Sequence, residues 1–452
     1  MKTKTRISLI LLLISAALTH ARAQAVLQAY IDEGLKGNLQ LKQEQLNYEK
    51  SVESLNIARS LFLPQIGLNA NYSLASGGRK IELPLGDLMN PVYSTLNKLT
   101  DSNQFPQLAN QSINFLPNNF HDTKVRVIQP LFNPDIYFNF KAQKELISVQ
   151  QAQKDAYENE LKYSITAAYY QYLQSNDVLK VLTETRGFLA ELLKLNQKLV
   201  ANQKATKDVV LSSEYEINKI DQQLAEAAKN HEVAKAYFNF LLNRDLNAEV
   251  IVDSTLVSHQ NDESLDQLRE AALSQRQEIK QLQRGLAASR HVMDLNRSSA
   301  LLPKINVVGD VGYQGFEYKF DNSQQYMLVQ FSLSWDIFKG GEKRARTQQA
   351  RIDYQVVENK MEQLRRQIEL QVIQSHYERQ ANEQAWATAQ SGVKSAEKNF
   401  QIVRSKYNEG QALLIEYLDA QNKWTTARLT QSIRLFDLLR AEAALQKTIA
   451  SI

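Results

Sequence analysis

Proline is confined to a small part of this chain, and that confinement limits where helices can run. Seven of the eight prolines fall between Pro64 and Pro134, and the eighth is Pro303. Proline removes a backbone donor and clashes within a helix, so it interrupts helices. The stretches 135–297 and 304–452 lack proline and are rich in Ala, Leu, Gln, Glu and Lys. Both are therefore predicted to be mainly helical.

Apolar and aromatic side chains in these stretches recur at alternating intervals of four and three residues. The longer series is Leu161, Ile165, Ala168, Tyr172, Ser175, Leu179, Leu182, Arg186, Leu189, Leu193, Asn196 and Val200. Such spacing is typical of a coiled-coil seam. The segments 135–200 and 342–409 would each form a helix about 100 Å long. That length favours coiled-coil helices over the alternative, an ordinary amphipathic helix in a compact bundle.

Short segments near the prolines alternate between apolar and polar residues, which predicts strands. They are 66–74, 305–313 and 327–337. A fourth strand is expected around 123–132 because of its position before the first long helix, although its alternation is poor. A period of two over about ten residues is typical of membrane-barrel strands with one lipid face and one lumen face. A half-buried sheet of a soluble protein gives the same pattern, so both remain open.

The same order of features occurs twice, which predicts an internal duplication. Residues 58–66 and 296–305 both pass from a helix through Leu-Pro into an alternating strand. The predicted repeats are 24–250 and 251–452, the second starting with an equatorial segment. Each contains a helix, a strand pair, a long helix and a returning helix, with strands at about 63–76, 122–133, 302–316 and 325–338. The segment 76–121 is expected to be a long surface loop. Four strands cannot close a membrane-spanning sheet without open edges. Three chains would supply twelve strands.

The N-terminus has the three parts of a cleavable export signal. Residues 1–6 are basic, 7–18 are almost wholly apolar, and Ala21-Arg22-Ala23 gives the small-x-small pattern of a cleavage site. The alternative, an anchor helix, is disfavoured because about 20 apolar residues are needed to span a bilayer. Residues 1–23 are therefore predicted to be a signal peptide. Without them the chain has equal numbers of basic and acidic residues, which disfavours a nucleic-acid partner.

No motif points to an enzyme, a metal or a cofactor. The chain has no cysteine, its histidines are not at metal-ligand spacing, and it lacks HExxH, P-loop and GxSxG motifs. An exported hydrolase is therefore disfavoured.

Residues 406–421, which read KYNEGQALLIEYLDAQ, combine an aromatic residue, a glycine turn and an acid-x-Leu-Asp-Ala run before a new helix. With the duplicated Leu-Pro units and the two long helices, this segment resembles the TolC family of outer-membrane efflux proteins. The resemblance covers essentially the whole chain after residue 23. It implies an α+β membrane protein of the outer membrane that extends into the periplasm. Three copies would form a twelve-stranded barrel and a tunnel of long antiparallel coiled-coil helices. This homotrimer would dock on an inner-membrane transporter through a periplasmic adaptor.

The resemblance also implies roles for particular residues. Glu416 and Asp419 match an acidic ring that closes the tunnel, which would favour cations as charged rings of other pores do. Tyr407 and Asp208 match a hydrogen-bonded lock of the closed state, whereas Ala412 replaces an arginine that strengthens this lock in some members.

Simpler interpretations of these residues remain open. The two acids also suit a solvated helix start, which the helix dipole favours. Tyr407 and Asp208 also suit an interfacial tyrosine and an exposed acid.

Two further expectations come directly from the residues, and the resemblance implies the function. Gly410 and Asn202 are suited to the left-handed position that ends a helix. Trp335, Phe338 and Tyr326 could form an aromatic belt at the membrane surface or pack within the sheet. The function predicted is that of a passive export duct in a tripartite efflux pump or type I secretion system. The alternative is a periplasmic coiled-coil adaptor or scaffold without a pore, which would account for the heptads but not for the strand pairs.

Overall fold

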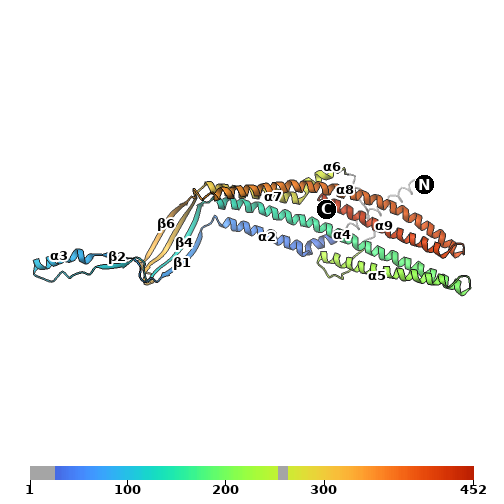
Figure 1. Cartoon of the computed structure of the whole chain (residues 1–452), viewed down its shortest axis with the longest axis horizontal. Coiled ribbons are helices and arrows are strands. Elements are labelled where there is room, and N and C mark those ends of the chain that lie inside the picture. Colours follow the sequence, from blue (N-terminus) through green and yellow to red (C-terminus); the bar gives the residue numbers. More distant parts are fainter. Residues whose placement is uncertain (1–25, 253–262, 452) are drawn as a thin grey trace, which may run out of the picture. The chain divides into compact units, whose positions relative to one another are not determined.

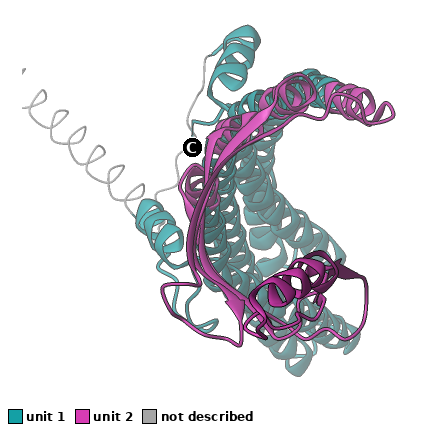
Figure 2. Cartoon of the chain, turned by 90° about the vertical axis from the view of Figure 1, so that its left-hand side faces the viewer, with its two compact units in different colours: residues 1–53, 144–289, 353–452 teal, residues 54–143, 290–352 magenta. Residues whose placement is uncertain are grey.

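The computed structural model describes residues 26–252 and 263–451, so the predicted signal peptide 1–23 lies outside the described residues. The chain forms two compact units (Figure 2). Unit 1 comprises residues 1–53, 144–289 and 353–452, and unit 2 comprises residues 54–143 and 290–352. Each unit draws on both predicted repeats, so the compact units do not coincide with the boundaries 24–250 and 251–452.

Long helices dominate the chain, as the proline-free stretches predict. The helices are α2 (Leu39–Ser60), α3 (Leu85–Thr100), α4 (Pro134–Ala201), α5 (Asp208–Leu242), α6 (Leu265–Gln275), α7 (Gln277–Leu301), α8 (Glu342–Asn408) and α9 (Leu414–Thr448). A further helix covers 26–37. The predicted long helices are confirmed as α4 and α8, with 68 and 67 residues, and the returning helices α5 and α9 have 35 residues each. Among the described residues, no helix combines the length and apolarity needed to cross a membrane.

The core of unit 1 forms where α4 meets the returning helices. Tyr169 of α4 is almost completely buried beside Phe238 of α5, with ring centroids 5.6 Å apart. Leu161, Ile165 and Tyr172, three positions of the heptad series, belong to the same cluster. Apart from the exposed Arg186, the predicted seam therefore lies on the buried side of α4, whose apolar burial stabilises the unit.

Unit 2 contains a four-stranded antiparallel sheet in the order β1-β4-β5-β6 (Figure 1). The strands are β1 (Gln65–Ser73), β4 (Phe120–Phe132), β5 (Lys304–Phe316) and β6 (Gln325–Ser334). All four predicted strands are confirmed, including the one that alternates poorly. The outer strands β1 and β6 each pair along one side only within the described residues.

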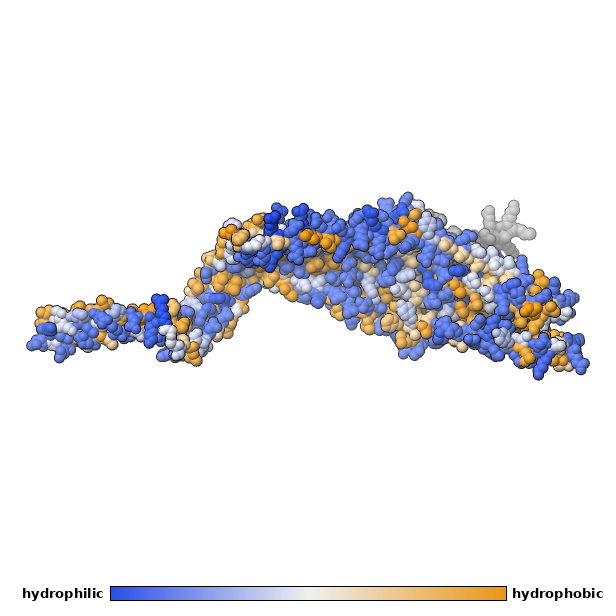
Figure 3. Space-filling model, in the orientation of Figure 1, coloured by the Kyte–Doolittle hydropathy of each residue, from blue (hydrophilic) through white to orange (hydrophobic). Residues whose placement is uncertain are grey.

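Strand register gives this sheet one apolar and one polar face. Leu68, Val125, Val311 and Met327 lie opposite one another across the four strands and share a face, because side chains alternate along a strand. The next row on the other face is Gly67, Arg126, Asp310 and Leu328. Apolar residues lie exposed over the strands (Figure 3).

The segment 76–121, expected as a surface loop, contains regular structure. Strands β2 (Lys80–Leu83) and β3 (Gln111–Asn114) pair antiparallel in a separate small sheet, and α3 lies between them in the sequence. Pro91 lies inside α3, so the prolines that predicted an irregular loop there do not prevent a helix.

Candidate functional site

Two helix turns in unit 1 lie close together, and we refer to the turns 202–207 and 409–413 with the adjoining helix ends as the tip. Gly410, predicted to adopt the left-handed conformation, has φ +74°. In the other turn Gln203 has φ +56°, so the prediction of Asn202 was wrong by one residue. The Asn202 amide instead donates to the Lys198 carbonyl (2.8 Å).

The same pair of backbone hydrogen bonds ends the long helix before each turn, α4 in one case and α8 in the other. Gln203 N–H donates to the Val200 carbonyl, and Lys204 N–H donates to Leu199. The corresponding bonds in the second turn run from Gly410 to Tyr407 and from Gln411 to Lys406. This pair of bonds is the Schellman arrangement, which satisfies the last carbonyls of a helix. The two turns therefore have the same backbone hydrogen bonds, although only the second has a glycine.

A buried hydrogen-bond chain joins three helices at the tip. The Tyr407 hydroxyl on α8 donates to Asn196 Oδ1 on α4 (2.6 Å). Asn196 Nδ2 donates in turn to Ser213 Oγ on α5 (2.8 Å), and Ser213 donates to the Val209 carbonyl (2.8 Å). Asn196 and Ser213 are fully buried. Buried polar groups of this kind are costly to leave unpaired. These linked hydrogen bonds therefore hold the three helices in one register.

The surroundings of Tyr407 keep its hydroxyl protonated. Its ring packs on Tyr417 with centroids 5.3 Å apart, and Tyr417 packs on Phe400 at 5.4 Å. Burial raises the pKa of the Tyr407 phenol, and the hydrogen bond to Asn196 only partly opposes this. Tyr407 therefore acts as a donor at physiological pH. Ala412 packs at the margin of the same apolar cluster.

The structure does not bring Tyr407 and Asp208 together within the chain. Asp208 is exposed at the start of α5, and its carboxylate accepts a hydrogen bond from Thr206. Asn196 is thus the partner of Tyr407 in place of the predicted Asp208. The sequence carried a signal for it, because Asn196 is a polar residue within the apolar heptad series, where such a residue typically fixes register.

Glu416 and Asp419 lie on the first two turns of α9, and both are exposed. Glu416 Oε2 accepts a hydrogen bond from the Leu413 N–H (2.8 Å), so it caps the helix. Asp419 pairs with Lys423 one turn later (2.7 Å). Both carboxylates remain on the surface of the single chain, where further copies could approach them.

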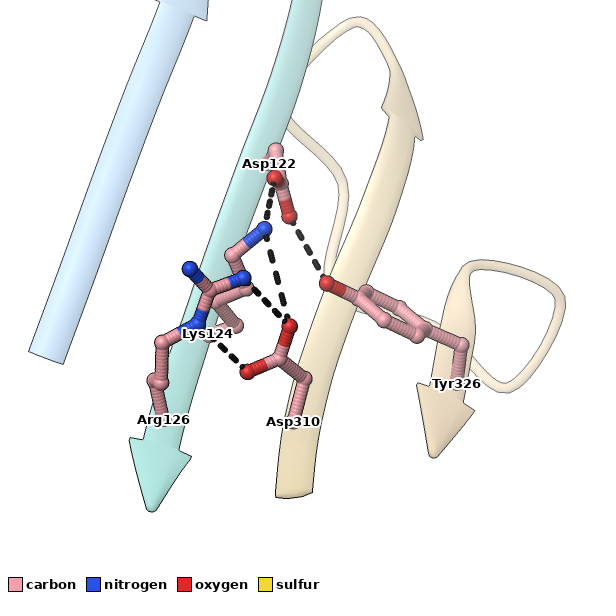
Figure 4. A network of polar contacts seen from close by, with 5 residues as sticks. All are labelled: Asp122, Lys124, Arg126, Asp310 and Tyr326. Carbon is pink, nitrogen blue, oxygen red and sulfur yellow. Dashed lines mark hydrogen bonds and ion pairs between the residues drawn. The ribbon is translucent and has the colours of Figure 1, made fainter. Parts of the chain in front are cut away.

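A charged network lies on the polar face of the sheet (Figure 4). Arg126 of β4 binds Asp310 of β5 through two parallel hydrogen bonds (2.8 and 2.7 Å). Lys124 pairs with Asp122 (2.5 Å), and Tyr326 of β6 donates to the other oxygen of Asp122 (3.0 Å). Bidentate pairs between arginine and carboxylate are geometrically specific. The network therefore ties β4 to β5 and β6.

This network separates the three aromatic residues considered for a belt or for packing within the sheet. Tyr326 binds Asp122 on the polar face of the sheet, whereas Trp335 and Phe338 are exposed. A different aromatic group lies at the other end of the strands, where Tyr318 contacts Tyr72 and Phe320 with centroids 5.6 and 5.2 Å apart. Sequence alternation did not identify this group, because the β5–β6 loop supplies two of its three members, Tyr318 and Phe320.

Among the described residues, no group of three or more His, Asp or Glu side chains is arranged to hold a metal ion. The polar arrangements at the tip and on the sheet hold helices and strands together. The hydrogen bonds at the tip fix the positions of helices, and the network on the sheet fixes strands and also carries charge.

Comparison with known proteins gives one consistent family. Residues 268–451 match the model of the family described as outer membrane efflux protein. The chain is 23% identical over 435 residues to the outer membrane protein TolC of Salmonella enteritidis, which covers 91% of this chain and 79% of that protein.

Solved structures agree on the fold. The CmeC outer membrane channel of Campylobacter jejuni superposes with a TM-score of 0.78 at 14% identity, covering 94% of this chain and 86% of that one. The open state of the MtrE outer membrane channel of Neisseria gonorrhoeae gives 0.75 at 17% identity, covering 94% and 88%.

Proposed function

We propose, from the premise that this chain is a TolC-family outer-membrane efflux protein, that it forms the outer-membrane channel of a tripartite efflux pump or type I secretion system. Three copies form a passive duct, with a twelve-stranded barrel in the outer membrane and a helical tunnel in the periplasm. A periplasmic adaptor connects the duct to an inner-membrane transporter, which supplies the energy. The twofold element order of the chain derives from internal duplication.

The observation that carries this proposal is the open amphipathic sheet. Strands β1 and β6 have free edges within the described chain, and free edges pair readily with other strands. Pairing β1 of one copy with β6 of the next closes the sheet and satisfies every backbone group, which a membrane requires. The apolar face then contacts lipid and the charged face lines the lumen.

A periplasmic scaffold without a pore accounts less well for the same face. It would leave Leu68, Met327 and Phe331 in water, and these side chains are 73%, 76% and 74% exposed in the single chain. Contiguous exposed apolar surface of this kind marks a contact with lipid or protein. Membrane extraction separates the two functions. A channel should resist carbonate and be released by detergent as a trimer, whereas release by carbonate as a monomer would contradict the duct.

The gate of the duct is formed at the tip by Glu416 and Asp419. They are one turn apart on α9, and a threefold axis beside this helix face would bring six carboxylates together. Such a ring concentrates cations. Tyr407 and Asn196 hold α8 to α4 in the closed state, and this contact takes the role that the family resemblance gives to Tyr407 and Asp208.

Neutralising the ring should weaken cation selectivity. In a Glu416→Gln/Asp419→Asn variant, the introduced glutamine keeps the capping hydrogen bond, because glutamine serves this position as well as glutamate. An acid about 4 Å from a cation contributes about 1 kcal/mol in water. The cation-to-anion permeability ratio in planar bilayers should therefore fall about fivefold or more.

The matched control is Glu226→Gln, an exposed acid of α5 that is paired with Lys229 as Asp419 is with Lys423. It should leave the ratio unchanged. A conducting double variant with the wild-type ratio would place the constriction elsewhere.

A further inference from the structure

The helix α3, which lies beyond the sheet in the β1–β4 connection, is fastened along one side to the segment that returns from it. Asn90 exchanges two hydrogen bonds with the backbone of Leu108 (2.9 and 2.7 Å), and Asn97 does the same with Phe105 (2.8 and 3.0 Å). A Cβ at Gly86 would collide with the Leu108 carbonyl. The helix and this segment thus form a preorganised unit.

Another side of α3 has no cover among the described residues. Leu85, Leu88, Val92, Thr95 and Leu99 follow strict 3-4 spacing, and we call these five residues the α3 seam. All five are exposed, with Leu88 at 65% and Leu99 at 78%. A seam with this spacing and four apolar residues requires partner helices.

We propose that the α3 seams of three copies pack together as a short parallel three-helix cap at the outer end of the duct. This inference rests on the proposed trimer. Strand β1, the free edge that would pair with the next copy, leads directly into this appendage, since only residues 74–79 separate β1 from β2. The edge contact and the seam contact therefore belong to one continuous interface between copies.

The charges of α3 favour a second copy over a lipid surface. Helices that bind anionic membrane surfaces carry Lys and Arg along the polar face. On α3 the only charged residues are Asp87 and Lys98, which balance each other, and neither lies in the seam. Three copies of this neutral helix can pack in parallel without charge repulsion, because no charged residue lies in the seam.

The length of α3 makes the cap dependent on the trimer. With 16 residues, α3 offers little more than two heptads, and helices of this length associate weakly alone. Tethering three copies at the sheet raises their effective concentration to the millimolar range.

Cysteine cross-linking tests the cap cleanly because the chain has no cysteine. A Leu88→Cys variant, expressed in the full chain and mildly oxidised in native membranes, should form disulfide-linked pairs. At most two of the three chains in each trimer can be linked, since each bond uses two thiols. Val92→Cys serves as a second seam position if Leu88→Cys folds poorly. The matched control is Ser94→Cys, which is exposed on another side of α3 and should stay unlinked.

The outcomes separate this inference from the proposed function. Trimers of the expected mass in which the Leu88→Cys thiol stays unlinked and is labelled by a water-soluble maleimide would overturn the cap and leave the duct intact. The same thiol shielded in membranes but labelled in detergent would assign the seam to lipid, which also overturns the cap. A protein that is monomeric after detergent extraction would overturn both the cap and the trimer.

Discussion

Replacing Tyr407 by phenylalanine should shift the tip toward its open state by about 1–3 kcal/mol, a change of about 5- to 150-fold in the closed-to-open equilibrium. The substitution removes the donor to Asn196 Oδ1, a buried acceptor that no longer finds a partner. The loss falls on the state in which α8 and α4 are in contact, because an open tip exposes Asn196 to water. Single-channel recordings should show a higher open probability and a larger mean conductance.

The double variant Tyr407→Phe/Asn196→Leu is the control for this effect. Replacing both partners of a buried hydrogen bond by apolar groups can be nearly neutral, whereas removing one leaves an unpaired group. Ser213 retains its bond to the Val209 carbonyl in the double variant. We expect its open probability to return toward that of the wild type.

The Asp208→Asn variant tests the partner implied by the family resemblance. Asp208 is exposed and has no bond to Tyr407, so this change should leave the open probability unaltered. An effect of Asp208→Asn larger than that of Tyr407→Phe would mean that Tyr407 changes partner in the assembled trimer, and would contradict the assignment to Asn196.

A Gly312→Val variant should fail to assemble in the outer membrane. Gly312 of β5 lies opposite Lys124 of β4, and a Cβ there would collide with the Thr123 carbonyl and lie 2.6 Å from Lys124 Cα. Backbone atoms of the neighbouring strand cannot move aside without breaking the pairing. Overpacking of this kind costs about 1–3 kcal/mol per site. A trimer contains three such sites, so the yield of folded trimers should fall by at least tenfold.

Gly309→Val in the same strand is the matched control. A Cβ at Gly309 meets nothing within 4 Å, and this position shares the apolar face with Val127 and Val329. Valine suits a strand and a lipid-facing position. Its trimer yield should equal that of the wild type when both are compared by band intensity on unheated gels. Equal yields for the Gly312 and Gly309 variants would show that β4 and β5 do not pair as described.

The long elements of this fold are readable from the sequence because their signals repeat many times. Proline-free stretches and a heptad series located α4 and α8 to within one residue at most of their ends, since a helix of this length shows its period repeatedly. The alternation of apolar and polar residues located the strands likewise, because it repeats along each strand. Strand β4 was the hardest to predict, because Lys124 and Arg126 alternate with only two apolar residues, Val125 and Val127.

The polar contacts were not readable, because they depend on distant partners. The partner of Tyr407 lies 211 positions away, and Asp310 lies 184 positions from Arg126. Asn196 left a trace, as one of three polar residues, with Ser175 and Arg186, in an otherwise apolar series. Gln203 adopts the left-handed conformation, although glycine or asparagine would suit it better. The hydrogen bonds of the turn decide which residue is left-handed, and for that reason the prediction of Asn202 failed.

We expect this chain to form a continuous duct through the outer membrane. The most direct test is the conductance of the purified, detergent-extracted protein in planar bilayers at several salt concentrations. We predict discrete channels of small, cation-selective conductance, because three tips constrict the pore with a ring of acids. A folded protein that inserts into the bilayer without conducting would contradict the duct.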